Sequence, residues 1–170
     1  MSIIISHQSA IELLHTDYVY RTITNSSRAT LQHPPAIPRK PPHVNEKREL
    51  WKTLHEILGT KPELPIHVSI TNSNTSYQTK GLKVHILNNK IPKSAFFEIL
   101  PNLYLTLPEC LPVQISRSCT VLELALLASE LMGTYYIDQE GELKSRESPL
   151  VTRKDFERFL RKNANIPGCA

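Results

Sequence analysis

Two histidines lie at the centres of two segments whose apolar residues alternate as they do in β-strands. His67 belongs to the segment 64–71, and His85 belongs to the segment 81–87. If these strands pair, the two imidazoles can face one another and bind a metal ion or transfer a proton. Two histidines do not complete a zinc site, and no third ligand lies at an informative spacing. We therefore interpret both as partly buried strand histidines with hydrogen-bonded rings. We expect no metal or other cofactor, and keep this pair as the metal candidates.

The residues that other catalytic sites require are missing from the chain. A magnesium-dependent nuclease of the PD-(D/E)xK type needs carboxylates on and before a strand, but the candidate strands IHVSI and LKVHI contain no acidic residue. The sequence also lacks the motifs GxSxG, HExxH and GxxxxGK[ST]. We predict that the protein is not an enzyme and has no catalytic residues. An enzyme that uses the His67/His85 pair is the alternative.

Positive charge is densest in a predicted helix near the C-terminal end, over residues 152–162. Its cationic residues are Arg153, Lys154, Arg158, Arg161 and Lys162, opposite an apolar stripe of Phe156, Phe159 and Leu160. Such a face can bind a phosphate backbone, and if nucleic acid is bound we expect this helix to make much of the contact. The alternative is a solvated cationic helix end that complements the helix dipole.

The length and composition of the chain indicate one folded domain. The 170 residues are 40% hydrophobic and 21% charged, with a net charge of +4 and a pI near 9.0, which is a mild bias toward polyanionic partners. Cys110, Cys119 and Cys169 are an odd number without CxxC spacing, which favours reduced thiols over a disulfide framework or a zinc knuckle. No apolar run is long enough to span a membrane. We predict a cytoplasmic protein with no membrane contact.

The elements that must position these residues form a mixed α/β pattern. We predict strands near 65–71, 81–87, 94–100 and 103–107, and further helices at 6–15, at 45–58 with Asn45 as its cap, from Pro108, and at 119–132. The prediction is a single α/β (α+β) domain over 1–170, with a mixed sheet of about four to five strands that helices 45–58 and 119–132 cover. Five prolines in residues 33–42 predict an extended connector, with a PxxP ligand as the alternative.

Several of these segments together resemble the N-terminal half of AbiEi-type antitoxin and regulator proteins of bacteria, many of which carry a C-terminal Vsr-like nuclease domain. The resemblance is chiefly in Leu-Pro-Glu-Cys and Glu-Leu-Met-Gly-Thr-Tyr, and it extends over residues 6–14, 65–70, 81–85, 103–110, 128–135 and 149–152. It implies a non-catalytic regulatory or nucleic-acid-associated module, with DNA or a toxin or nuclease protein as partner. The alternative is a protein-interaction domain that acts on a toxin or nuclease.

Two departures limit what this resemblance implies. Relatives of this kind often have an Arg-rich segment after the histidine strand, whereas residues 72–78 are almost uncharged here, so a DNA-contact loop is not expected at that place. The nuclease half and a preceding winged helix are both missing from the sequence. We therefore expect a stand-alone or truncated accessory domain whose oligomeric state the sequence does not define.

Overall fold

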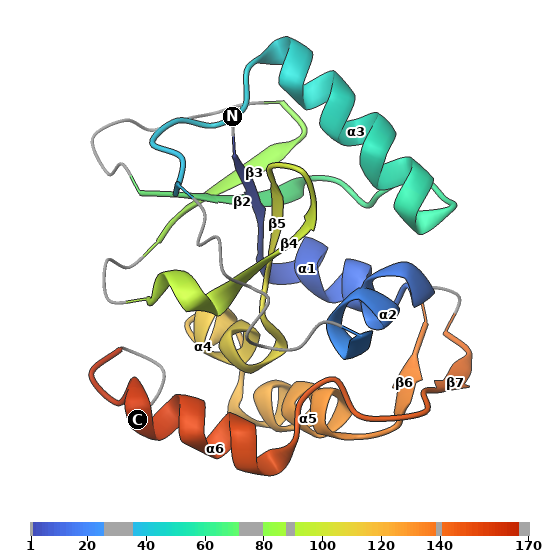
Figure 1. Ribbon diagram of the computed structural model, residues 1–170, viewed down its shortest axis with the longest axis vertical. Coiled ribbons are helices and arrows are strands. Elements are labelled where there is room, and N and C mark those ends of the chain that lie inside the picture. Colours follow the sequence, from blue (N-terminus) through green and yellow to red (C-terminus); the bar gives the residue numbers. More distant parts are fainter. Residues whose placement is uncertain (1, 26–35, 72–79, 88–90, 139–140, 167–170) are drawn as a thin grey trace. The chain divides into compact units, whose positions relative to one another are not determined.

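A computed structural model describes residues 2–25, 36–71, 80–87, 91–138 and 141–166, and the chain divides into two compact units. The first unit, Met1–Thr106, contains a five-stranded sheet, and the second, Leu107–Ala170, contains helices and a two-stranded sheet (Figure 1). The predicted mixed α/β class is confirmed. The assignment of residues 1–170 to one domain stays a prediction.

The five strands lie in the order β3-β2-β1-β5-β4 and combine parallel with antiparallel pairing. Parallel pairs are β1 with β5 and β2 with β3, and antiparallel pairs are β1 with β2 and β4 with β5. The strands are β1 (Ile3–Ile5), β2 (Ile66–Ile70), β3 (Leu82–Ile86), β4 (Phe96–Leu100) and β5 (Leu103–Thr106). The four predicted strands are present, and the central strand β1 was not predicted from the sequence.

Strand β1 forms from three consecutive isoleucines, whose β-branched side chains favour an extended backbone. Ile4 and Ile5 have no solvent exposure, so the strand is buried on both faces, as a central strand is. A run of three apolar residues is too short to show either strand or helix periodicity. Its place in the sheet comes from its pairing with β2 and β5.

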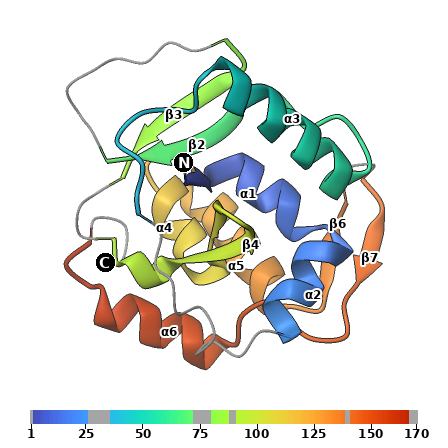
Figure 2. The ribbon, with the colours of Figure 1, turned by 45° about the horizontal axis from the view of Figure 1, so that its top comes forward.

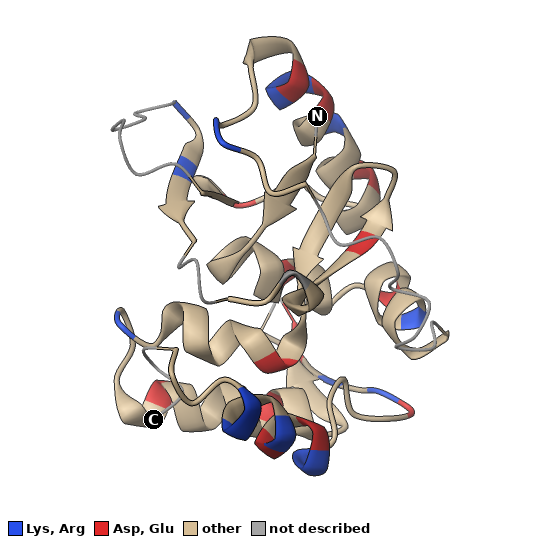
Figure 3. Cartoon of the chain, turned by 60° about the vertical axis from the view of Figure 1, so that its left-hand side comes forward, with Lys and Arg blue, Asp and Glu red and all other residues tan. Residues whose placement is uncertain are grey.

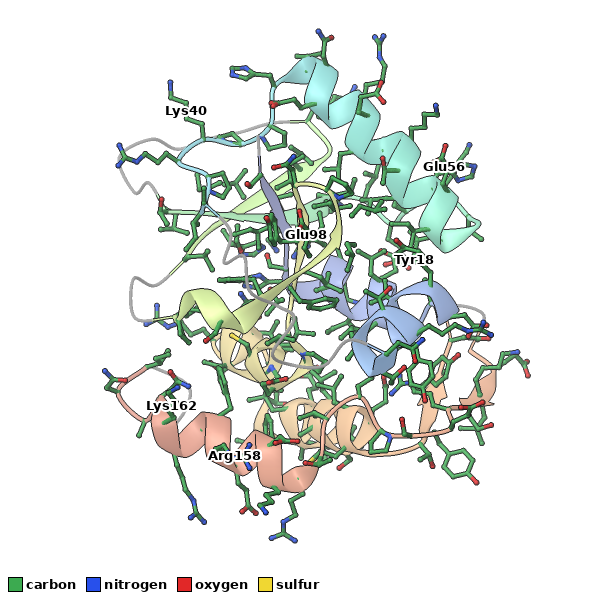
Figure 4. The ribbon with its side chains drawn as sticks, viewed as in Figure 1. Tyr18, Lys40, Glu56, Glu98, Arg158 and Lys162 are labelled. Carbon is green, nitrogen blue, oxygen red and sulfur yellow. The ribbon has the colours of Figure 1, made fainter. Side chains whose placement is uncertain are left out.

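Among its described residues, the first unit contains three helices: α1 (His7–Leu14), α2 (Asp17–Asn25) and α3 (Val44–Leu58). Helix α1 contacts β2 and β5 and was predicted. Helix α2 was not predicted, because most of its residues are β-branched or aromatic and so have a low helix propensity. It buries Val19, and its Tyr18 hydroxyl donates to the Ile99 carbonyl of β4 at 2.9 Å (Figure 4).

Helix α3 was predicted, but its cap lies closer to the N-terminus of the chain than expected. His43 is the N-cap in place of Asn45, and its backbone N–H donates to the Glu46 carboxylate at 2.8 Å. Gly59 ends the helix in the left-handed conformation that favours glycine. The helix lies beside the start of β3, where a Cβ on Gly81 would come within 3.2 Å of the Trp51 ring (Figure 2).

The second unit begins with a 3-10 turn at Pro108–Cys110 and the short helix α4 (Leu111–Ile115). Helix α5 (Val121–Met132) is followed in the sequence by the antiparallel strands β6 (Tyr135–Ile137) and β7 (Leu143–Ser145). Helix α6 (Arg153–Lys162) comes after them. Thr120 and Thr152 cap the two helices through their side-chain oxygens. Coverage of the sheet by the helix at 119–132 stays a prediction.

The proline-rich connector is described only from residue 36 onward. Residues 36–42 form neither helix nor strand, and the Pro38 carbonyl accepts the Thr71 N–H at 2.9 Å, at the end of β2. Residues 33–35 and the polar loop 72–78 lie outside the described residues. No helix within the described ranges is both long and apolar enough to cross a membrane. The cytoplasmic location stays a prediction.

Candidate metal centre

The register of β2 against β3 gathers polar side chains on one face of the sheet. His67 is the partner of Lys83, and Ser69 is the partner of His85. Because side chains alternate between the two faces of a strand, these four residues share one face. The alternate residues of β2 are buried on the other face: Ile66, Val68 and Ile70. The alternation in IHVSI and LKVHI therefore predicts the polar face correctly.

The two predicted histidines form a hydrogen-bonded pair. His85 Nε2 lies 3.1 Å from His67 Nδ1, and the ring centroids are 4.9 Å apart. One of these nitrogens carries the proton that the other accepts. Both rings are partly buried. The prediction of partly buried histidines with hydrogen-bonded rings is thus confirmed.

A third imidazole joins this pair from the N-terminal end of α1. The His7 ring stacks on His85 with centroids 3.5 Å apart and planes 12° apart, and it lies 6.0 Å from the His67 ring. One ring nitrogen from each of the three residues lies within 4.8 Å of the other two. His7 was not predicted as a site residue, because its position depends on strand β1. This strand pairs with β2 and ends at Ile5, two residues before His7.

The backbone of His7 adopts a conformation that costs energy. Its φ of 52° lies in the left-handed region, which costs a non-glycine residue about 1 kcal/mol or more. Hydrogen bonds hold the preceding residue: the Ser6 N–H donates to the His67 carbonyl at 3.1 Å, and the Ser6 carbonyl accepts the Ala10 N–H at 3.3 Å. Such strain persists where the surroundings impose it, which is frequent at functional sites.

A chain of two buried serines is hydrogen-bonded to the His7 ring through Ser6. Ser69 donates its hydroxyl to Ser6 Oγ at 2.7 Å, and Ser6 Oγ lies 3.0 Å from His7 Nδ1. Neither serine is exposed to solvent. When His7 carries its proton on Nδ1, that N–H donates to Ser6, and Nε2 is then the unprotonated ring nitrogen. Hydrogen bonds of this kind orient metal-binding histidines.

The environment keeps the strand histidines neutral. Burial lowers the pKa of His85 to about 3, with added contributions from the charges of His7, His67 and Lys83. Burial, followed by the Lys83 charge, also lowers the pKa of His67. Both rings are therefore uncharged at neutral pH, and a neutral imidazole is the form that binds metal ions.

The donor set fits a transition-metal ion such as zinc. Zinc–nitrogen distances of about 2.0–2.1 Å in a tetrahedral site separate ligand nitrogens by about 3.4 Å, close to the 3.1 Å between His67 and His85. Lone pairs lie in the ring planes, so the stacked His7 and His85 rings cannot both point at one ion until one of them turns. No carboxylate or thiolate of the described residues joins the three histidines, which argues against magnesium or calcium.

The five predicted nucleic-acid contacts all lie on α6, in the second unit, and all are exposed. Their charges are partly offset by the helix's own acidic residues (Figure 3). Arg153 and Arg161 reach the Glu157 carboxylate at 2.9 and 3.8 Å, and Arg158 reaches Asp155 at 3.0 Å. Figure 4 labels two members of this basic face, Arg158 and Lys162. Three of the five cations thus already have an anionic neighbour.

No protein-family model, curated protein or solved structure matches the chain. The resemblance to AbiEi-type regulators, with the DNA, toxin or nuclease partner that it implies, therefore stays a prediction.

Proposed function

We propose that the unit Met1–Thr106 binds one divalent transition-metal ion, with zinc as the best fit, through His7, His67 and His85. The observation that carries this proposal is the convergence of three imidazoles from three different elements. A hydrogen-bonded pair alone would explain His67 and His85, but it leaves unexplained why a strained residue brings a third ring against them.

The remaining features of the site support the same proposal. Neutral ligands bind a cation without first losing a proton, and the hydrogen bond with Ser6, which Ser69 in turn contacts, restrains the His7 ring. Three protein ligands leave a fourth position of a tetrahedral ion for water or another ligand. Under this proposal the His67/His85 pair is part of a three-histidine metal centre. The expectation that the protein is not an enzyme stays a prediction, and an enzyme that uses these histidines stays the alternative.

Titration of zinc and cobalt into tag-free, chelator-stripped protein tests the proposal, with metal content measured after desalting. We expect one ion per chain. His67→Ala and His85→Ala should each weaken binding by at least about a hundredfold, since loss even of an outer hydrogen-bond partner costs about tenfold to a hundredfold. The matched control is His55→Ala, because His55 lies exposed on α3 outside the cluster. Equal affinities in all four proteins would refute the proposal.

A second candidate function rests on α6. All five of its cationic side chains are exposed, and the resemblance to antitoxin-type regulators favours contact with nucleic-acid phosphates. The ion pairs with Asp155 and Glu157 weaken this candidate, because those carboxylates compete with phosphate for three of the five cations. Measured binding to duplex DNA at low salt, and its salt dependence, tests it.

A further inference from the structure

Lys83 lies on the same face of the sheet as the histidine centre. It is the register partner of His67 on the neighbouring strand and stands two positions before His85 on its own strand. Its side chain is exposed, and its positive charge contributes to the lowered pKa of both rings. Within the described ranges no acidic residue forms an ion pair with Lys83.

A divalent ion bound at this place leaves the centre strongly positive. The three imidazoles contribute no negative charge, and among the residues that the structure describes no carboxylate joins them. Lys83 adds a positive charge, and the N-terminal end of α1, which begins at His7, adds the positive end of the helix dipole. These charges oppose a bare cation, and an anion in the open coordination position offsets them.

We propose that the centre formed by His7, His67 and His85 binds an oxyanion of the phosphate class, with one oxygen on the metal ion and another accepting a hydrogen bond from Lys83 Nζ. This inference rests on the proposed function, because the metal supplies the first contact. Phosphate fits better than a carboxylate because it carries up to two negative charges near neutral pH and has oxygens to spare for both contacts. The Lys83 ammonium is a compact point charge, which is how lysine contacts phosphate.

Titration of inorganic phosphate into zinc-loaded, desalted protein tests the inference. We expect Lys83→Gln to weaken phosphate binding about tenfold, because one charge-assisted hydrogen bond is removed. The same variant should bind zinc as tightly as the wild type or more tightly, because a like charge has been removed. Lys83→Arg should keep most of the phosphate affinity. Lys52→Gln, an exposed lysine of α3, is the matched control and should behave as the wild type.

The outcomes separate this inference from the function on which it rests. Zinc binding with the same phosphate affinity in Lys83→Gln and wild type overturns the inference and leaves the proposed function standing. Failure of the wild type to bind zinc overturns both. Acetate bound as tightly as phosphate overturns the assignment to the phosphate class, and phosphate bound equally well without zinc overturns the role of the metal.

Discussion

His7 determines whether the cluster is a set of metal ligands or an ordinary histidine pair. Its position could not be predicted from the sequence, because His7 is far along the chain from His67 and His85 and only β1 pairing brings it near. The strand histidines, by contrast, follow from alternation within IHVSI and LKVHI. Sequence reasoning thus finds two of the three proposed ligands and misses the residue that completes the site.

Replacing His7 by Asn removes the imidazole ligand but keeps a residue that tolerates the left-handed backbone conformation. Asn adopts the left-handed region readily, so the free energy of unfolding of the metal-free variant should lie within about 1 kcal/mol of the wild-type value. The variant lacks the imidazole and should lose zinc affinity by at least about a hundredfold. Urea unfolding in chelator and zinc titration measure the two effects. Retained zinc affinity would show that His7 is not a ligand.

The stability of the metal-free protein should depend on pH through His85. Its pKa is about 3 in the folded protein against 6.5 in an unfolded chain, so between these values the unfolded state binds a proton that the folded state does not. Stability is therefore complete above pH 6.5 and falls as the pH falls toward 3. His67, whose pKa is also lowered, adds to the loss, and His7 and Lys83 are the other groups that face the ring.

Urea unfolding with chelator at about pH 7.5 and about pH 5 measures this effect. We expect His85→Gln to reduce the difference between the two conditions by about 1 kcal/mol, a value discounted for the partial exposure of the ring. His55→Gln provides the matched control, because His55 lies outside the cluster. The same pH dependence in wild type and His85→Gln would show that folding does not lower the pKa of His85.

Among the helices and strands, some helix ends are determined by residues at the ends themselves. Thr120 and Thr152 cap α5 and α6, and Gly59 ends α3, and each of these residue types is a local signal for a helix end. Strand β1 and helix α2 were missed because their formation depends on partners distant in sequence, such as the Ile99 carbonyl that anchors Tyr18. Tertiary contacts that override weak local preference account for both misses.

Helix α6 gives a prediction of its own if the protein binds duplex DNA. Replacing Arg158, Arg161 and Lys162 by Gln should lower the slope of log affinity against log salt by up to about 2.7, at about 0.9 for each phosphate that is no longer neutralised. The ion pairs of Arg158 and Arg161 with acidic neighbours reduce the change expected from these two residues. The slope is measured by fluorescence anisotropy over a salt series.

The control for this experiment removes the same charge from another surface. Arg48, Lys52 and Lys61 are exposed cations of the first unit, and their replacement by Gln should leave the slope near the wild-type value. An equal decrease of slope in both triple variants would mean that binding follows net charge alone. Undetectable binding by the wild type would remove the second candidate function.

For the whole molecule, the division into two units separates the two candidate functions. The histidine centre and Lys83 lie in Met1–Thr106, and the basic helix lies in Leu107–Ala170. The fold class was predictable because strand alternation and helix amphipathicity are strong signals over most elements. The division was not, because it reflects contacts between segments rather than a linker visible in the sequence.

Zinc-edge anomalous diffraction from zinc-loaded crystals would show whether the three histidines bind one metal ion. We expect one anomalous peak about 2.0–2.1 Å from a ring nitrogen of His7, of His67 and of His85, with the stacked rings turned apart. The 3.1 Å interaction between His67 Nδ1 and His85 Nε2 should then no longer be a hydrogen bond. A peak elsewhere, or histidines that keep their stacking and hydrogen bond at saturating zinc, would refute the three-histidine metal centre.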